Sequence, residues 1–125
     1  MAPLTTARIR ECIDTIEKSY EFLLSYAALG AENEGASKVG SQLRDYLQQT
    51  RSALGALAEG VGRVDAGGGN EKFLAIIAAD AGRAKAVVGA VLRRPTISSH
   101  IIDNLNASAH VRTVLTDLFL LDELL

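Results

Sequence analysis

Proline occurs at only two positions of this 125-residue chain, Pro3 and Pro95, and this scarcity favours helix almost everywhere between them. The interior is rich in alanine, leucine, glutamate and arginine, which are residues of high helix propensity. Regular alternation of apolar and polar residues, the pattern of a half-buried strand, does not extend over any useful length. The sequence therefore predicts an all-α fold.

Four helical segments follow from the apolar periodicity and the turn signals. The expected helices cover about residues 6–29, 37–61, 70–94 and 97–125. Thr5 or Thr6 is the expected N-cap of the first helix and Gly30 its end, while Asn70 is the expected N-cap of the third. Five of the eleven residues 60–70 are glycine, so this stretch is predicted to be a flexible loop between two helical hairpins.

The short links within each hairpin favour antiparallel neighbours, and two such hairpins make an antiparallel up-down four-helix bundle. With 48% hydrophobic and 22% charged residues, the chain is expected to form one domain over residues 1–125. The alternative is a pair of open hairpins that closes only when two copies dimerise.

Composition excludes several classes of function. The net charge of −2 argues against a general nucleic-acid-binding protein. No run of about 18 apolar residues is present, so no membrane span is expected, and the first residues lack the apolar stretch of a secretory signal. The single cysteine, Cys12, cannot form an internal disulfide. It fits the reducing cytoplasm and is expected to be a buried structural residue of the first helix.

The last eleven residues, L-T-D-L-F-L-L-D-E-L-L, carry seven large apolar side chains. At about 100° per residue these extend most of the way around a helix, whereas one bundle core covers only a stripe. The tail is therefore predicted to be half core and half interface. Phe22 and Tyr26, four residues apart, form a second apolar patch, and His110 lies on the interface side of the last helix. The expected interface residues are Phe22, Tyr26, His110, Leu120, Leu121, Leu124 and Leu125.

Two charged residues fall on faces that are otherwise apolar, Asp80 on the third predicted helix and Arg112 on the fourth. A buried charge requires a partner, because removing one member of a buried pair costs about 3–5 kcal/mol. One hypothesis is that Asp80 and Arg112 pair across this hairpin in a structural, non-catalytic contact. The alternative is that both side chains extend to solvent.

A strip of small residues runs along the third predicted helix. Glycine is unfavourable inside a helix, so the strip points first to a closely approaching helix and second to an apolar ligand pocket. The two histidines, His100 and His110, lie about 15 Å apart on one helix and cannot share a metal ion, so no metal or cofactor is expected. The small residues are Ala75, Ala78, Gly82, Ala86 and Gly89.

No nucleophile–base or acid–base constellation can be nominated from the sequence. The function predicted is therefore that of a non-enzymatic accessory, scaffold or adaptor protein. It would act through contact with another protein and form a homodimer through its C-terminal helix. The alternative is a bundle that binds a small molecule or cofactor beside the Ala/Gly strip of the third helix.

Overall fold

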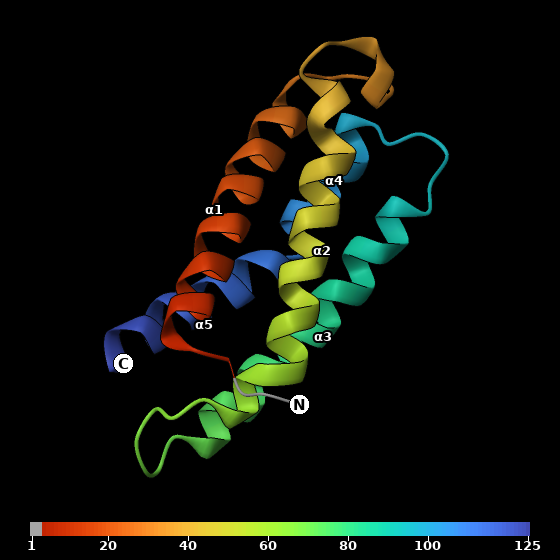
Figure 1. Cartoon of the computed structure of the whole chain (residues 1–125). Helices are drawn as coiled ribbons and strands as arrows, with labels where there is room; N and C mark the ends of the chain where they lie inside the picture. Colours follow the sequence, from red (N-terminus) through yellow and green to blue (C-terminus); the bar gives the residue numbers. More distant parts are fainter. Residues whose placement is uncertain (1–3) are drawn as a thin grey trace.

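A computed structural model describes residues 4–125, and all of the regular structure within them is helical (Figure 1). This confirms the predicted all-α class. None of the helices described is long and apolar enough to cross a bilayer. The α-helices are α1 (Thr6–Ala28), α2 (Leu43–Gly60), α3 (Glu71–Leu92), α4 (Ser99–Ala107) and α5 (His110–Leu124). Three short 3-10 turns lie between them, η1 (Glu34–Ala36), η2 (Gly40–Gln42) and η3 (Val61–Arg63).

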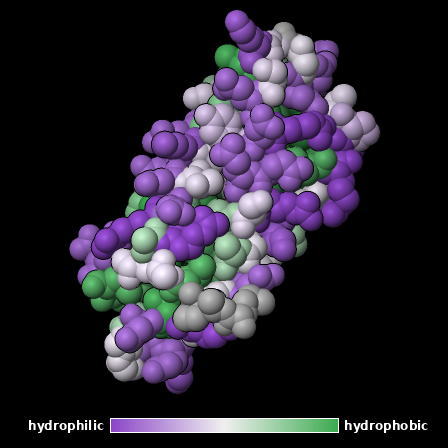
Figure 2. All heavy atoms as spheres, in the orientation of Figure 1, coloured by the Kyte–Doolittle hydropathy of each residue, from purple (hydrophilic) through white to green (hydrophobic). Residues whose placement is uncertain are grey.

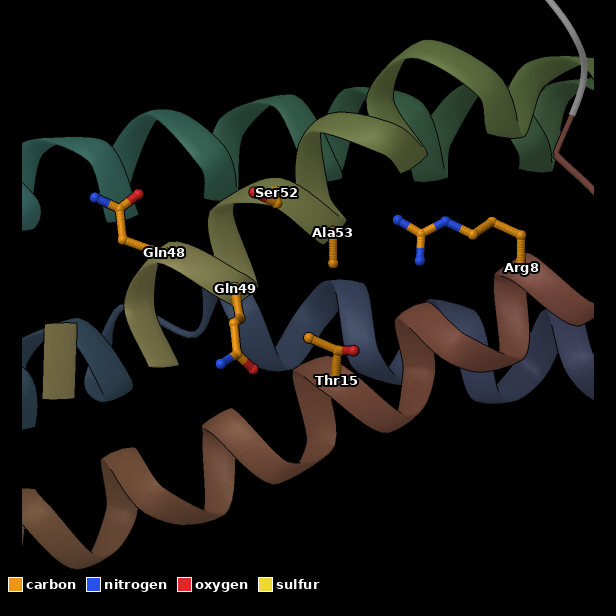
Figure 3. A pocket seen from close by; sticks show the side chains of 6 residues that line it. All are labelled: Arg8, Thr15, Gln48, Gln49, Ser52 and Ala53. Atoms are coloured by element: carbon orange, nitrogen blue, oxygen red, sulfur yellow. The ribbon is translucent and has the colours of Figure 1, made fainter. Parts of the chain in front are cut away.

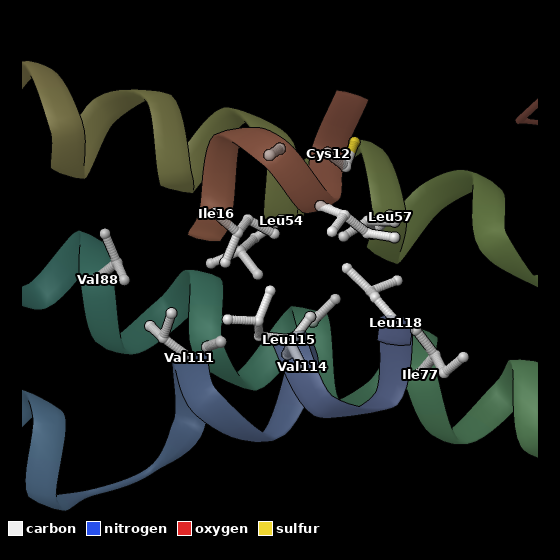
Figure 4. Close-up of a cluster of buried hydrophobic side chains, with 14 of the residues drawn as sticks. Cys12, Ile16, Leu54, Leu57, Ile77, Val88, Val111, Val114, Leu115 and Leu118 are labelled. Atoms are coloured by element: carbon white, nitrogen blue, oxygen red, sulfur yellow. The ribbon is translucent and has the colours of Figure 1, made fainter. Parts of the chain in front are cut away.

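The helices enclose one apolar core. α1 packs on α2, α4 and α5, and α3 packs mainly on α2 and α5. Figure 4 shows Cys12 and Ile16 of α1, Leu54 of α2, Ile77 of α3 and Leu118 of α5 converging on the same cluster. All five side chains are fully buried. The predicted burial of Cys12 is thus confirmed, and burial raises the pKa of its thiol.

α2 begins six residues later than predicted, because residues 34–42 contain two 3-10 turns instead of a helical turn. These turns pack tightly on each other at Gly40. A Cβ atom placed on Gly40 would lie 2.3 Å from the backbone oxygen of Glu34, closer than any side chain tolerates. The absence of a side chain at Gly40 therefore lets η1 approach η2.

The segment predicted as one helix over residues 97–125 forms two helices, because the chain bends at Ala109. This residue has left-handed backbone angles, φ 64° and ψ 7°, and it separates α4 from α5. Ser98 caps α4 by accepting a hydrogen bond from the backbone N–H of Ile101 at 3.1 Å. The bend gives the two halves different neighbours, since α4 packs mainly on α1 while α5 packs on both α1 and α3.

Replacing Ala109 by glycine is expected to raise the free energy of unfolding by about 0.5–1 kcal/mol. Left-handed backbone costs an L-residue roughly 1–2 kcal/mol, and the larger backbone entropy of glycine in the unfolded chain offsets only part of that gain. Urea denaturation measures the change. The matched control is Ala107→Gly within α4, which should lower stability by about the same amount. A destabilised Ala109→Gly variant would contradict this assignment.

A polar clasp formed by Tyr26, Glu34, Arg44, Ile97 and Ser99 joins the connections at one end of the molecule. The Arg44 guanidinium donates to Glu34 Oε1 from Nε at 2.9 Å and from Nη2 at 2.8 Å. The backbone N–H of Ile97 donates to Glu34 Oε2 at 2.6 Å. Burial alone would raise the pKa of Glu34, but these hydrogen bonds and the charge of Arg44 hold it below its usual value.

The other half of the clasp fixes the end of α1 to the start of α4. The Tyr26 hydroxyl donates to the backbone oxygen of Ile97 at 2.6 Å. Ser99 Oγ donates to the backbone oxygen of Tyr26 at 2.6 Å and accepts from the backbone N–H of Ala31 at 2.9 Å. Burial, together with the charge of Glu34, raises the pKa of the Tyr26 hydroxyl and so keeps it a donor.

Candidate functional site

The C-terminal half of α5 presents an apolar surface to solvent. Figure 2 shows the hydrophobic atoms gathered at the end of the molecule where α5 terminates, while hydrophilic atoms dominate the other end of this face. Four large apolar side chains near the end of α5 form this surface, which we call the α5 patch. They are Phe119 (44% exposed), Leu120 (54%), Leu124 (48%) and Leu125 (38%).

The opposite face of α5 belongs to the core. Leu118 and Leu121 are fully buried (Figure 4 shows Leu118). Leu121 was predicted to be an interface residue, and this is corrected by the structure, because the bend at Ala109 rotates it toward the core. Leu120, Leu124 and Leu125 are exposed as predicted.

The prediction that Tyr26 is an interface residue is also wrong. It is fully buried and its hydroxyl is used by the clasp. Phe22 is half-buried and stacks on Tyr46 of α2, with ring centroids 4.5 Å apart. It thus covers the junction of α1 with α2 and is not part of the α5 patch. His110 is half-buried at the first turn of α5, about 15 Å along the helix from Leu120.

An ion pair borders the α5 patch. Arg10 Nε of α1 donates to Asp122 Oδ1 at 3.0 Å, and both side chains remain accessible, 60% and 38% exposed. Screening by solvent makes such a pair weak in isolation. Its consequence for the surface is that a positive and a negative group lie side by side at the rim.

The predicted pair between Asp80 and Arg112 does not form. Among residues 4–125, Asp80 makes its ion pair with Arg83, one turn along α3, at 3.1 Å. The three-residue spacing brings Arg83 within reach, while Arg112 is exposed on α5. The residue of α5 that meets Asp80 is Asp117, and the two carboxyl groups interact across the junction of α3 and α5.

Two adjacent carboxylates cannot both ionise at low cost, so one of them retains a proton. Burial, the hydrogen bond to Asp80 and the charge of Asp80 raise the pKa of Asp117 to about 7. Asp117 Oδ2 is buried and has no hydrogen-bond partner among the described residues, so its ionised form would be poorly stabilised.

The wild-type protein is therefore expected to lose stability as the pH rises from about 4 to above 7. The pKa of Asp117 is raised on folding, so its contribution is fully present below the unfolded value and disappears as pH passes the folded value near 7. In Asp117→Asn, the neutral amide can donate to Asp80 at every pH. Urea denaturation at pH 5 and pH 8 should show a smaller pH effect in this variant. An unchanged pH effect would exclude the shared proton.

The small strip of α3 is not a continuous helix-packing surface. Ala75 and Ala86 are exposed, and no atom lies within 4 Å of a Cβ placed on Gly82. Of the two glycines in the strip, only Gly89 is buried. The group that packs against it is the Arg51 guanidinium of α2. Ala78, the remaining member, is half-buried against the core.

Two hollows of the surface lie away from this strip. One of about 330 Å³ lies between α1 and α2 (Figure 3). It is open to solvent, and its Arg8 side chain is engaged in an ion pair with Glu11 at 3.2 Å. Its lining residues are Arg8, Thr15, Gln48, Gln49, Ser52 and Ala53. A second, of about 370 Å³, lies between α1 and α4 beside Tyr20 and Asp103. Neither of these two hollows is lined by a residue of the strip.

Side chains that could hold a metal ion are a further kind of candidate site. Residues 4–125 contain no group of three histidine, cysteine or acidic side chains arranged to hold a metal ion. Comparison of the chain with protein-family models, with curated proteins and with solved structures finds no match. Function is therefore inferred from the geometry of the described residues.

Proposed function

We propose that this protein acts by contact, as a non-enzymatic accessory, scaffold or adaptor protein whose α5 patch joins two copies of the chain. The observation that carries the proposal is the patch itself, four large apolar side chains that are 38–54% exposed on one helix. Surface patches of this kind are typical of interaction sites. In the proposed dimer, α4 and α5 together serve as the fourth helix of an antiparallel bundle, and the partner covers the outer face of α5.

The energetics favour a modest affinity. Full burial of a leucine or phenylalanine contributes about 1.5–3 kcal/mol, so covering the exposed half of four such residues contributes roughly 3–6 kcal/mol. Association itself costs about 4 kcal/mol or more. The patch can thus form the centre of an interface, while polar neighbours must supply the rest.

The charged residues beside the α5 patch favour a second copy of the chain as the partner that covers it. A two-fold axis brings the same surface of both chains together. If residue i of one copy contacts residue j of the other, residue j of the first copy also contacts residue i of the second. Arg10 and Asp122 lie together at the rim. A symmetric partner can therefore place its Asp122 against Arg10 and its Arg10 against Asp122. The cytoplasm is the compartment proposed, since it keeps Cys12 reduced.

The double variant Leu120→Asp/Leu124→Asp is expected to weaken self-association at least about tenfold, because two carboxylates would be buried in the apolar centre of the interface. Sedimentation equilibrium over a range of concentrations measures the dissociation constant, and circular dichroism checks the helix content. The matched control is Leu24→Asp/Val39→Asp, which alters two apolar residues of similar exposure outside the patch. A wild-type protein that stays monomeric, or an equal effect of both variants, would refute the proposal.

A further inference from the structure

A third hollow, of about 450 Å³, lies on the groove between α2 and α3 and has two cationic side chains in its wall. Arg51 comes from α2 and Lys85 from α3. Two uncharged donors of α2, the Gln48 amide and the Ser52 hydroxyl, line the same groove. One carboxylate, that of Glu59, also borders it. The groove involves neither α5 nor any residue of the α5 patch.

Each cation lies over a glycine of the facing helix. A Cβ placed on Gly89 of α3 would lie 3.6 Å from Nε and 3.7 Å from Cζ of Arg51. A Cβ placed on Gly55 of α2 would lie 3.3 Å from Nζ of Lys85, which is a tight contact. Glycine is unfavourable within a helix relative to alanine. The two glycines are thus explained by the space they give to the cations.

This reciprocal arrangement sets the spacing of the two charges. Arg51 and Gly55 are one turn apart on α2, and Lys85 and Gly89 are one turn apart on α3. Because each cation lies over the glycine of the other helix, the two charged groups are offset by about one turn along the groove, roughly 6 Å measured parallel to the helices. Both line the same hollow, so an oxyanion seated in it would meet both donors.

Neither cation has a polar partner in the described part of the chain. Among residues 4–125, Arg51 and Lys85 form no ion pair and no side-chain hydrogen bond. Two like charges held about one turn apart repel each other, and an anion between them removes that repulsion. Glu59 lies one turn beyond Gly55 on α2, so its carboxylate limits the site at that end.

We propose that the α2–α3 groove binds a phosphate group, either free or as a monoester, through Arg51 and Lys85, with Gln48 and Ser52 as additional donors. The guanidinium supplies a planar pair of N–H donors and the ammonium supplies a point charge. The contrasting interpretation is that both side chains only cover apolar surface with their methylene stems.

The test is a titration with inorganic phosphate and with O-phosphoserine, followed by amide chemical shifts, with chloride used to keep the ionic strength constant. We expect saturable shifts centred on Gly55 and Gly89. Arg51→Gln and Lys85→Gln should each weaken binding about three- to fivefold, as expected for loss of one exposed charge interaction. Glu59→Gln should strengthen it. Tighter binding of one ligand than the other identifies whether the site takes free phosphate or an ester.

Lys72→Gln and Arg112→Gln are the matched controls, since they remove an exposed cation from elsewhere on the molecule. Both should bind phosphate as the wild type does. Shifts that are absent, that do not saturate, or that weaken equally in all four charge variants would overturn the proposal. Because the groove does not include the α5 patch, this outcome is independent of whether the protein dimerises.

Discussion

Replacing Leu121 by alanine is expected to lower the free energy of unfolding by about 2–5 kcal/mol, although its neighbour Leu120 should tolerate the same change. Leu121 is fully buried, so its truncation removes apolar contacts and leaves a cavity in the core. Leu120 is 54% exposed and has little such packing to lose. The two leucines are adjacent on α5 and share the same chemistry, which makes each the control for the other.

Urea denaturation at low protein concentration measures both variants while keeping self-association from contributing to stability. The expected cost of Leu120→Ala is below about 0.5 kcal/mol, the range of ordinary surface substitutions. Equal effects of the two substitutions would show that α5 does not have the orientation described, and would remove the basis for the α5 patch.

Glu34→Ala is expected to cost about 3 kcal/mol, because it breaks the clasp at its centre. The side chain of Glu34 is only 17% exposed and accepts hydrogen bonds from both Arg44 and the Ile97 backbone. Its removal leaves these donors without their acceptor, and hydrogen bonds to a charged group contribute about 1.5–3 kcal/mol each. The control is Glu32→Ala, in the same connection but exposed. Thermal and urea denaturation should separate the two variants clearly.

The clasp should also respond to acid. The pKa of Glu34 is held below its unfolded value, so its contribution is present above that value and is lost as pH falls through the folded pKa. Glu34→Gln should therefore flatten the loss of stability at acidic pH. This effect lies at lower pH than that of Asp117, whose pKa is about 7, and the two can be measured in one series.

Local patterns predicted α1, α3 and the end of α2 to within about two residues, because each helix has a continuous apolar stripe, but the start of α2 was predicted six residues too early. The bend at Ala109 carried no such signal, since alanine is a strong helix former and an L-residue rarely adopts left-handed backbone angles. The side of α5 that Leu121 occupies depended on that bend. The prediction that Asp80 pairs with Arg112 came from a helical wheel that treated residues 97–125 as one helix. Because the chain bends at Ala109, the residue of α5 that faces Asp80 is Asp117.

The clasp was beyond sequence reasoning for a different reason. Glu34 and Arg44 are common surface residues, and only their placement beside the Ile97 backbone makes them structural. Tyr26 resembled an exposed aromatic because its hydroxyl partner lies 71 residues away in the chain. By contrast, the exposure of Leu120 and Leu124 followed from the number of leucines, which exceeds what one core can cover.

The contacts of α1 have a consequence for the order in which the chain can fold during synthesis. Leu23 accepts a hydrogen bond from Asn106, 83 residues later, and Arg10 meets Asp122, 112 residues later. α2 and α3 are neighbours in sequence and can pack together early. α1 is synthesised before α4 and α5, so part of its apolar stripe must stay uncovered until those two helices emerge. A nascent chain stopped before residue 99 should need a chaperone that the finished protein does not.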